Sequence, residues 1–123
     1  GMEALDWVAV KAKLPPMRHS FGVGDATCVA SGRLSFVLGL HGPCKTMDTA
    51  CSSGLCAAHG ADSAIRNDES RFALGAGVSL KLLPRMTMFL VTAGTLSVDG
   101  RCQTFDARAN GYVRAEGLGA LVL

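Results

Sequence analysis

The sequence predicts a layered α/β domain. Segments with a helical pattern of small apolar residues alternate with short apolar segments typical of strands, and glycine or proline separates most of them. Hydrophobic residues make up 49% of the chain but aromatic residues only 6%, which indicates a core of small aliphatic side chains. The same composition argues against an intrinsically disordered chain.

The chain begins with an ambiguous element and continues into a helix. Residues 1–12 fit either a helix or a strand, and the proline pair at 15–16 ends that element. Asp25 is in position to cap a helix over residues 26–38, where apolar residues recur at helical spacing. Gly39 then closes this helix, because glycine readily adopts the left-handed conformation of a C-terminal cap.

A strand, a second helix and another strand are expected next. Residues 45–49 are rich in β-branched and apolar side chains and contain no breaker, so they predict a short strand. A helical run of small residues follows and extends to about Asn67. Residues 72–78 predict a short buried strand in which glycines allow close backbone approach.

The remaining elements alternate in the same way. Pro84 opens a loop or short helix, and residues 87–96 predict a helix. Gly100 marks a turn, and a closing strand begins near Gly119. This alternation is the pattern on which the α/β prediction rests.

Cys51 lies at the junction between the strand predicted over 45–49 and the helix of small residues. Ser52 and Ser53, which follow it, are residue types that cap helix N-termini. Unpaired N–H groups and the helix dipole favour an anion there, and a helix N-terminus lowers the pKa of a thiol below its usual value of about 8.5. Thiolate is the nucleophilic form, and the same N–H groups suit the oxyanion of an acyl transfer. The alternative for Cys51 is a buried structural thiol.

Three ordered segments of the chain match the motifs of one known family. Residues 48–53 read Asp-Thr-Ala-Cys-Ser-Ser and resemble its active-site signature. Residues 30–40 resemble the stretch that precedes the signature, and residues 96–106, continuing into 111–117, resemble the stretch that follows it. The family is that of β-ketoacyl synthases, in particular the ketosynthase domains of polyketide synthases, and the resemblance covers the chain from about residue 20 onward.

The resemblance implies a thiolase-like fold and a decarboxylative Claisen condensation, in polyketide or fatty acid biosynthesis. The fold expected is a partial thiolase-like α/β fold, layered α/β/α, with its N-terminal half incomplete. Cys51 would be the catalytic residue that receives an acyl group as a thioester. An acyl carrier protein would be the partner and would supply the phosphopantetheine arm, with no cofactor bound directly by the chain. A homodimer is implied for the full-length protein.

The chain departs from the family in lacking both histidine motifs. The two catalytic histidines of the family lie in later motifs, His-Gly-Thr-Gly-Thr and Asn-Ile-Gly-His, and neither motif occurs in these 123 residues. We therefore expect residues 1–123 to be a single partial domain, an internal fragment that contains the nucleophile and is inactive in condensation by itself. A smaller departure is Gly54, where the family more often has serine or alanine.

Charge and cysteine content narrow the class of protein further. The net charge is +2 and the basic residues are scattered, so the sequence shows no basic patch of the kind that binds nucleic acid. No apolar run approaches the roughly 18 residues that a membrane span needs. The five cysteines form no CxxC pair, which argues against a zinc site or a disulfide framework. A reducing compartment fits best, so we expect a cytoplasmic protein, with a plastid as the alternative.

Other polar residues are better explained by structure than by chemistry. His59 is expected to be packed on the helix, whereas His19 and His41 are expected in loops. The acidic residues Asp48 and Glu116 are expected to hold backbone N–H groups beside tight turns. Three arginines are expected to be solvated or to pair within loops: Arg101, Arg108 and Arg114. Phe105 and Asp106 are expected to anchor their own loop.

Three other functions compete with the ketosynthase hypothesis. One is a thiolase or chalcone-synthase-type condensing enzyme that uses coenzyme A thioesters. Another is a thiol hydrolase, which would release free acid. The third is a non-catalytic structural subunit; such subunits in the family commonly lack the cysteine, so Cys51 argues against this alternative.

Overall fold

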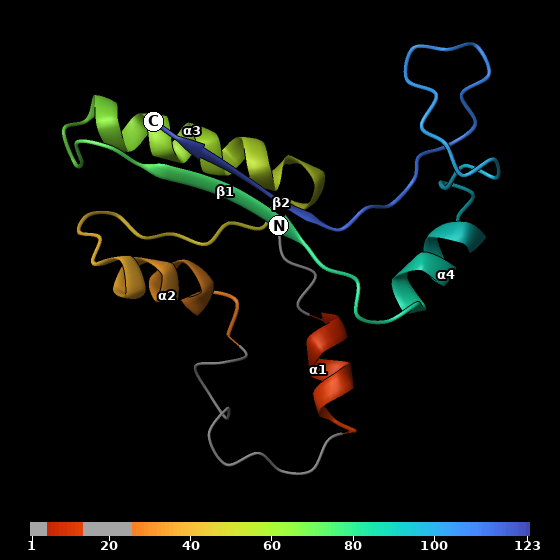
Figure 1. The fold of residues 1–123 in the computed structure, drawn as a ribbon, viewed down its shortest axis with the longest axis horizontal. Helices are drawn as coiled ribbons and strands as arrows, with labels where there is room; N and C mark the ends of the chain where they lie inside the picture. The colour runs from red at the N-terminus through yellow and green to blue at the C-terminus, as the bar shows by residue number, and fades with distance from the viewer. Residues whose placement is uncertain (1–4, 14–25) are drawn as a thin grey trace.

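The computed structural model describes residues 5–13 and 26–123, and the statements below concern these residues. In order, the elements are α1 (Leu5–Lys11), α2 (Val29–Leu38), the 3-10 turn η1 (Ala50–Ser52), α3 (Ser53–Arg66), β1 (Leu74–Ser79), α4 (Arg85–Thr92) and β2 (Gly117–Val122). Among the described residues, helices and strands alternate only from α3 onward, and α1, α2 and α3 follow one another with no strand between them (Figure 1). The predicted cap Asp25 and the predicted loop residue His19 lie outside the described residues.

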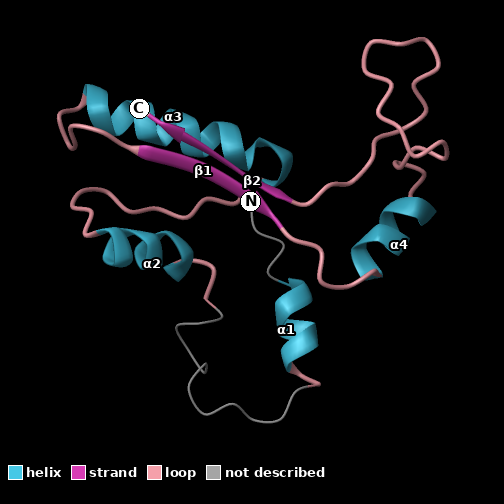
Figure 2. Cartoon of the chain, in the orientation of Figure 1, coloured by secondary structure: helices cyan, strands magenta, loops and turns pink. Residues whose placement is uncertain are grey.

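The centre of the structure is an antiparallel ribbon of β1 and β2 with α3 lying along it (Figures 1 and 2). Gly75 pairs with Leu121 in the register of the ribbon. A Cβ added to Gly75 would lie 3.2 Å from Cα of Ala58, so strand and helix touch through their backbones. The predicted close approach is therefore confirmed, although the strand begins at Leu74 and not at residue 72.

Helix ends follow local sequence closely. Gly39 has φ of 63° at the end of α2, and its N–H donates to the Phe36 carbonyl while Leu40 N–H donates to Ser35. This is a Schellman ending, which the glycine predicted. The same pattern ends α4 four residues earlier than expected, because Gly94 has φ of 67° and Thr95 N–H donates to the Leu90 carbonyl.

The strand predicted over residues 45–49 does not form. This segment has no regular secondary structure, and no strand among the described residues pairs with it. Thr46 instead meets α2, where its hydroxyl accepts the Ser31 N–H at 3.3 Å and lies 2.9 Å from the Ser31 hydroxyl. A strand needs a hydrogen-bonded neighbour, which local β propensity cannot supply.

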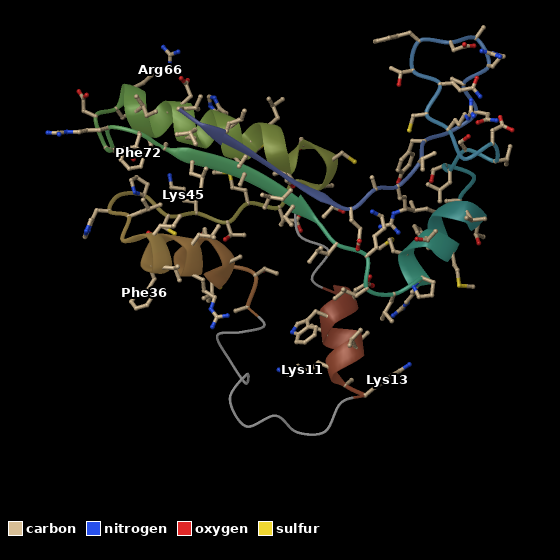
Figure 3. The ribbon with its side chains drawn as sticks, in the orientation of Figure 1. Lys11, Lys13, Phe36, Lys45, Arg66 and Phe72 are labelled. Atoms are coloured by element: carbon tan, nitrogen blue, oxygen red, sulfur yellow. The ribbon has the colours of Figure 1, made fainter. Side chains whose placement is uncertain are left out.

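The packed core of the described residues is small. Of their hydrophobic side chains, only Ala61 and Ala64 on α3 are buried, so the prediction of buried strands was wrong: β1 is mostly half-buried and β2 is exposed throughout. Phe36 is 87% exposed and projects from α2 (Figure 3). Large apolar side chains of other elements are exposed as well; they include Met88, Phe89, Leu118 and Val122. These faces are therefore not covered by the described elements.

Candidate active site

Cys51 is exposed on η1, immediately before Ser52, the N-cap of α3. The structure thus places the thiol where the sequence predicted it, on a tight turn that feeds a helix. The chain enters this turn as irregular backbone instead of a strand. Cys51 is exposed and, within the described residues, its sulfur makes no hydrogen bond.

The turn is held in a strained backbone conformation. Ala50, the residue before Cys51, has φ of 55°, in the left-handed region. For a residue with a Cβ this conformation costs about 1–2 kcal/mol. Asp48 compensates on one side, because its Oδ1 accepts the Ala50 N–H at 3.1 Å. The expectation that Asp48 holds a backbone N–H is confirmed.

Ser52 and Ser53 do not cap α3 with their side chains. The Ser52 hydroxyl points back toward Thr49, where its oxygen is 2.8 Å from both the carbonyl oxygen and Oγ1. The Ser53 hydroxyl accepts the Thr49 N–H at 2.9 Å and donates to the Ala50 carbonyl at 2.7 Å. Both serines therefore brace the turn before the helix. Sequence reasoning assigned them to the helix because serine after a strand is a capping signal.

Thr49 also connects the turn to the body of α3. Its hydroxyl donates to the sulfur of Cys56, which is half-buried, at 3.4 Å. Cys56 therefore links the turn to α3 through its sulfur. Cys44 and Cys102 are exposed, and Val113 N–H donates to the Cys102 sulfur at 3.1 Å.

The two histidines among the described residues are His59 on α3 and His41 in a loop. His59 is exposed on α3, so the prediction of a packed histidine was wrong. His59 is two positions before the buried Ala61, a rotation of about 200° around the helix axis, so His59 faces away from the buried side of α3. His41 is exposed in a loop, as expected.

Glu116 joins the start of β2 to the end of β1. Its Oε1 accepts the Lys81 N–H at 2.5 Å, and the Lys81 ammonium group donates to the Ala115 carbonyl. Asp6 of α1 binds the backbone of the two residues after Lys81: its carboxylate accepts the Leu82 N–H at 3.2 Å and the Leu83 N–H at 3.0 Å. The expectation that Glu116 holds backbone N–H groups is confirmed.

The loop between α4 and β2 is tied together by polar side chains. Asp106 pairs with Arg108 at 2.9 Å, and this hydrogen bond lowers the pKa of the exposed Asp106 carboxyl. Arg108 therefore pairs within its loop and Arg101 is exposed, as expected, whereas Arg114 donates to the hydroxyl of Thr87 in α4 at 2.8 Å. Phe105 is fully exposed at φ of 62°, so only Asp106 of the predicted pair anchors the loop.

The described residues offer neither a cluster of metal ligands nor a membrane-spanning helix. Nowhere in these parts of the chain do three or more histidine, cysteine, aspartate or glutamate side chains gather as they would around a metal ion. None of the helices described has the length and apolar character needed to cross a membrane.

Comparisons with known proteins agree on one family. Residues 3–123 match the sequence profile of the family described as "Beta-ketoacyl synthase, N-terminal domain". A 6-methylsalicylic acid synthase of Penicillium terrestre is 44% identical over 110 residues, which is 89% of this chain and 6% of that protein. A phenolphthiocerol/phthiocerol polyketide synthase of Mycobacterium tuberculosis is 47% identical over 102 residues, 83% of this chain and 7% of that protein.

A solved structure agrees with the fold. The ketosynthase from module 6 of the bacillaene synthase of Bacillus subtilis 168 is 45% identical, with a TM-score of 0.76, over 87% of this chain and 20% of that chain. The expectation of a partial thiolase-like fold is therefore confirmed. The chain spans a small part of the length of the proteins that it matches.

Proposed function

The chain belongs to the β-ketoacyl synthase family, and from this membership we propose that Cys51 is the acyl-accepting nucleophile of a polyketide ketosynthase. The observation that carries the proposal is an exposed thiol on a strained turn, directly before a helix of 14 residues. The positive end of that helix favours negative charge, both on sulfur and on an oxyanion.

The reaction proposed has two covalent stages. First, the Cys51 thiolate attacks the carbonyl carbon of an acyl thioester on the phosphopantetheine arm of an acyl carrier protein. A carbon–sulfur bond forms to Cys51, and the carrier thiolate leaves and takes up a proton. Covalent catalysis of this kind divides one difficult step into two easier ones.

In the second stage a malonyl-type extender on a carrier protein loses carbon dioxide. The electron pair of the broken carbon–carbon bond stays on the α-carbon, which attacks the acyl carbonyl on Cys51. The Cys51 thiolate then leaves, and the product is a β-ketoacyl thioester longer by two backbone carbons. The groups that assist decarboxylation in the family are histidines of two motifs that residues 1–123 do not contain.

We further propose that residues 1–123 are a partial ketosynthase domain and do not condense by themselves. Two observations support this. The chain covers 20% of a solved ketosynthase chain, and large apolar side chains of α2, α4 and β2 are uncovered in the described residues. A polyketide pathway, a homodimer and a cytoplasmic location complete the proposal; the polyketide synthase named among the relatives supports the first.

Acylation of the full-length protein tests the role of Cys51. We expect incubation with an acyl carrier protein thioester to add one acyl group, and intact-protein and peptide mass spectrometry to locate it on Cys51. The Cys51→Ala variant should gain no acyl group, while Cys44→Ala, which removes another exposed cysteine, should behave as wild type.

The same experiment separates the alternative functions. Acylation by free coenzyme A thioesters but not by carrier thioesters would favour a thiolase or chalcone-synthase-type enzyme. Release of free acid without chain extension would favour a thiol hydrolase. An acyl group that persists in Cys51→Ala would refute the assignment of the nucleophile.

A further inference from the structure

Ser53 is the most deeply buried side chain near the candidate nucleophile. It is only 2% exposed, although Cys51 and Ser52 beside it are exposed. Its hydroxyl uses both of its capacities, because it accepts the Thr49 N–H and donates to the Ala50 carbonyl. Removing this hydroxyl would leave the Thr49 N–H without its acceptor, while the Ala50 carbonyl would keep only the hydrogen bond from the Ser53 backbone N–H.

The two groups that Ser53 binds lie on either side of the strained residue. Thr49 N–H precedes the left-handed Ala50, and the Ala50 carbonyl belongs to the peptide that leads into Cys51. With Asp48 bound to the Ala50 N–H, the polar backbone groups around this residue have partners. Ala50 therefore cannot relax to a right-handed conformation without breaking hydrogen bonds.

Ser52 cannot replace Ser53 in this arrangement. The Ser52 hydroxyl reaches only Thr49, which lies before Ala50. Ser53 alone contacts the backbone both before and after the strained residue. The Ser53 hydroxyl therefore holds the turn from its buried side, together with the Ser53 backbone N–H, which also donates to the Ala50 carbonyl.

We propose that Ser53 is a positioning residue for Cys51: its buried hydroxyl holds Ala50 in the left-handed conformation and so keeps the Cys51 thiol at the positive end of α3. The proposal rests on the proposed function of Cys51 as acyl acceptor. Ser53 itself touches no reacting atom, so it acts on the rate of acyl transfer and not on the binding of the carrier protein.

The first test is acylation kinetics in the full-length protein with three variants. Ser53→Ala is expected to lower the maximal rate of Cys51 acylation about tenfold, the factor that corresponds to the loss of a hydrogen bond that leaves the Thr49 N–H unpaired, and to leave KM unchanged. Ser53→Thr keeps the hydroxyl and should restore the rate to within about twofold, on the same reasoning. Ser63→Ala, on the same helix, removes a hydroxyl that has no hydrogen bond within the described residues and should not change the rate.

The second test does not depend on the proposed function. Iodoacetamide labels exposed thiols, and peptide mass spectrometry gives the labelling rate of Cys51 relative to that of the exposed Cys44 in the same molecule. Ser53→Ala should lower this ratio, and Ser53→Thr should restore it. A wild-type protein that forms no acyl-enzyme would refute the acyl-accepting role of Cys51, while the ratio would still decide the role of Ser53.

Two results would overturn the proposal. One is a Ser53→Ala protein that acylates at the wild-type rate and keeps the wild-type ratio of Cys51 to Cys44 labelling. The other is a Ser53→Thr protein that melts like wild type but is as slow as Ser53→Ala, because a hydroxyl would then not be the group that matters.

Discussion

Replacing Gly75 with alanine tests the contact between β1 and α3 on which the position of Cys51 depends. The added Cβ would lie 3.2 Å from Ala58 Cα, 3.4 Å from the Ala57 carbonyl oxygen and 3.4 Å from Ala58 N. All three neighbours are backbone atoms, so the strand or the helix must move. Overpacking of this kind costs about 1–3 kcal/mol.

A smaller favourable effect opposes this cost. Alanine restricts the unfolded chain more than glycine does and so stabilises by about 0.4–1 kcal/mol. The expected net loss in the free energy of unfolding is therefore about 1–2 kcal/mol. Displacement of α3 at Ala58 would also shift the start of the same helix and the turn η1 before it, where Cys51 lies, so the acylation rate should fall as well.

Gly77→Ala is the matched control, because Gly77 is on the same face of β1 two residues later. Its added Cβ would meet only Gly54 Cα, at 3.8 Å, which is ordinary contact. Urea unfolding of the full-length protein gives the comparison. If Gly75→Ala were as stable as Gly77→Ala, the close approach of strand and helix described above would be wrong.

Two further predictions concern α3 and the loop before β2. Gly54→Ala should raise the free energy of unfolding by up to about 1 kcal/mol, because a Cβ there meets no atom within 4 Å and alanine favours the helix; unchanged or lower stability in urea would contradict this. Because Arg108 lowers the pKa of Asp106, the pair stabilises the loop above pH of about 4 and loses this effect only as pH falls through the lowered pKa. An NMR titration should show the Asp106 midpoint rising in Arg108→Ala, and an unchanged midpoint would count against the pairing.

Several features that depend on nearby residues were predicted correctly. Gly39 predicted the end of α2, and Asn67 the end of α3, because a helix ends where one or two residues adopt a cap conformation. The prediction for the end of α4 was wrong although Gly94 carries the same signal as Gly39. The position of Cys51 before α3 also followed from the local pattern.

Features that depend on distant residues were not predicted. The segment 45–49 has strand propensity, yet no described strand pairs with it. The exposure of His59 depends on which side of α3 packs against β1, and the helix sequence alone did not reveal this. The role of Ser53 depends on the left-handed conformation of Ala50. The sequence does not predict this conformation, because alanine rarely adopts it.

The sequence by itself determined the class of fold, the family motifs and the cysteine at the start of a helix, because these reside in residue types and short spacings. The tertiary structure alone decided that β1 pairs antiparallel with β2, that Ala58 of α3 is the partner of the close approach at Gly75, and that a buried serine braces the turn before Cys51. Each of these depends on hydrogen bonds or burial that arise only when the folded chain brings backbone and side chains together, and residue type does not specify such partners.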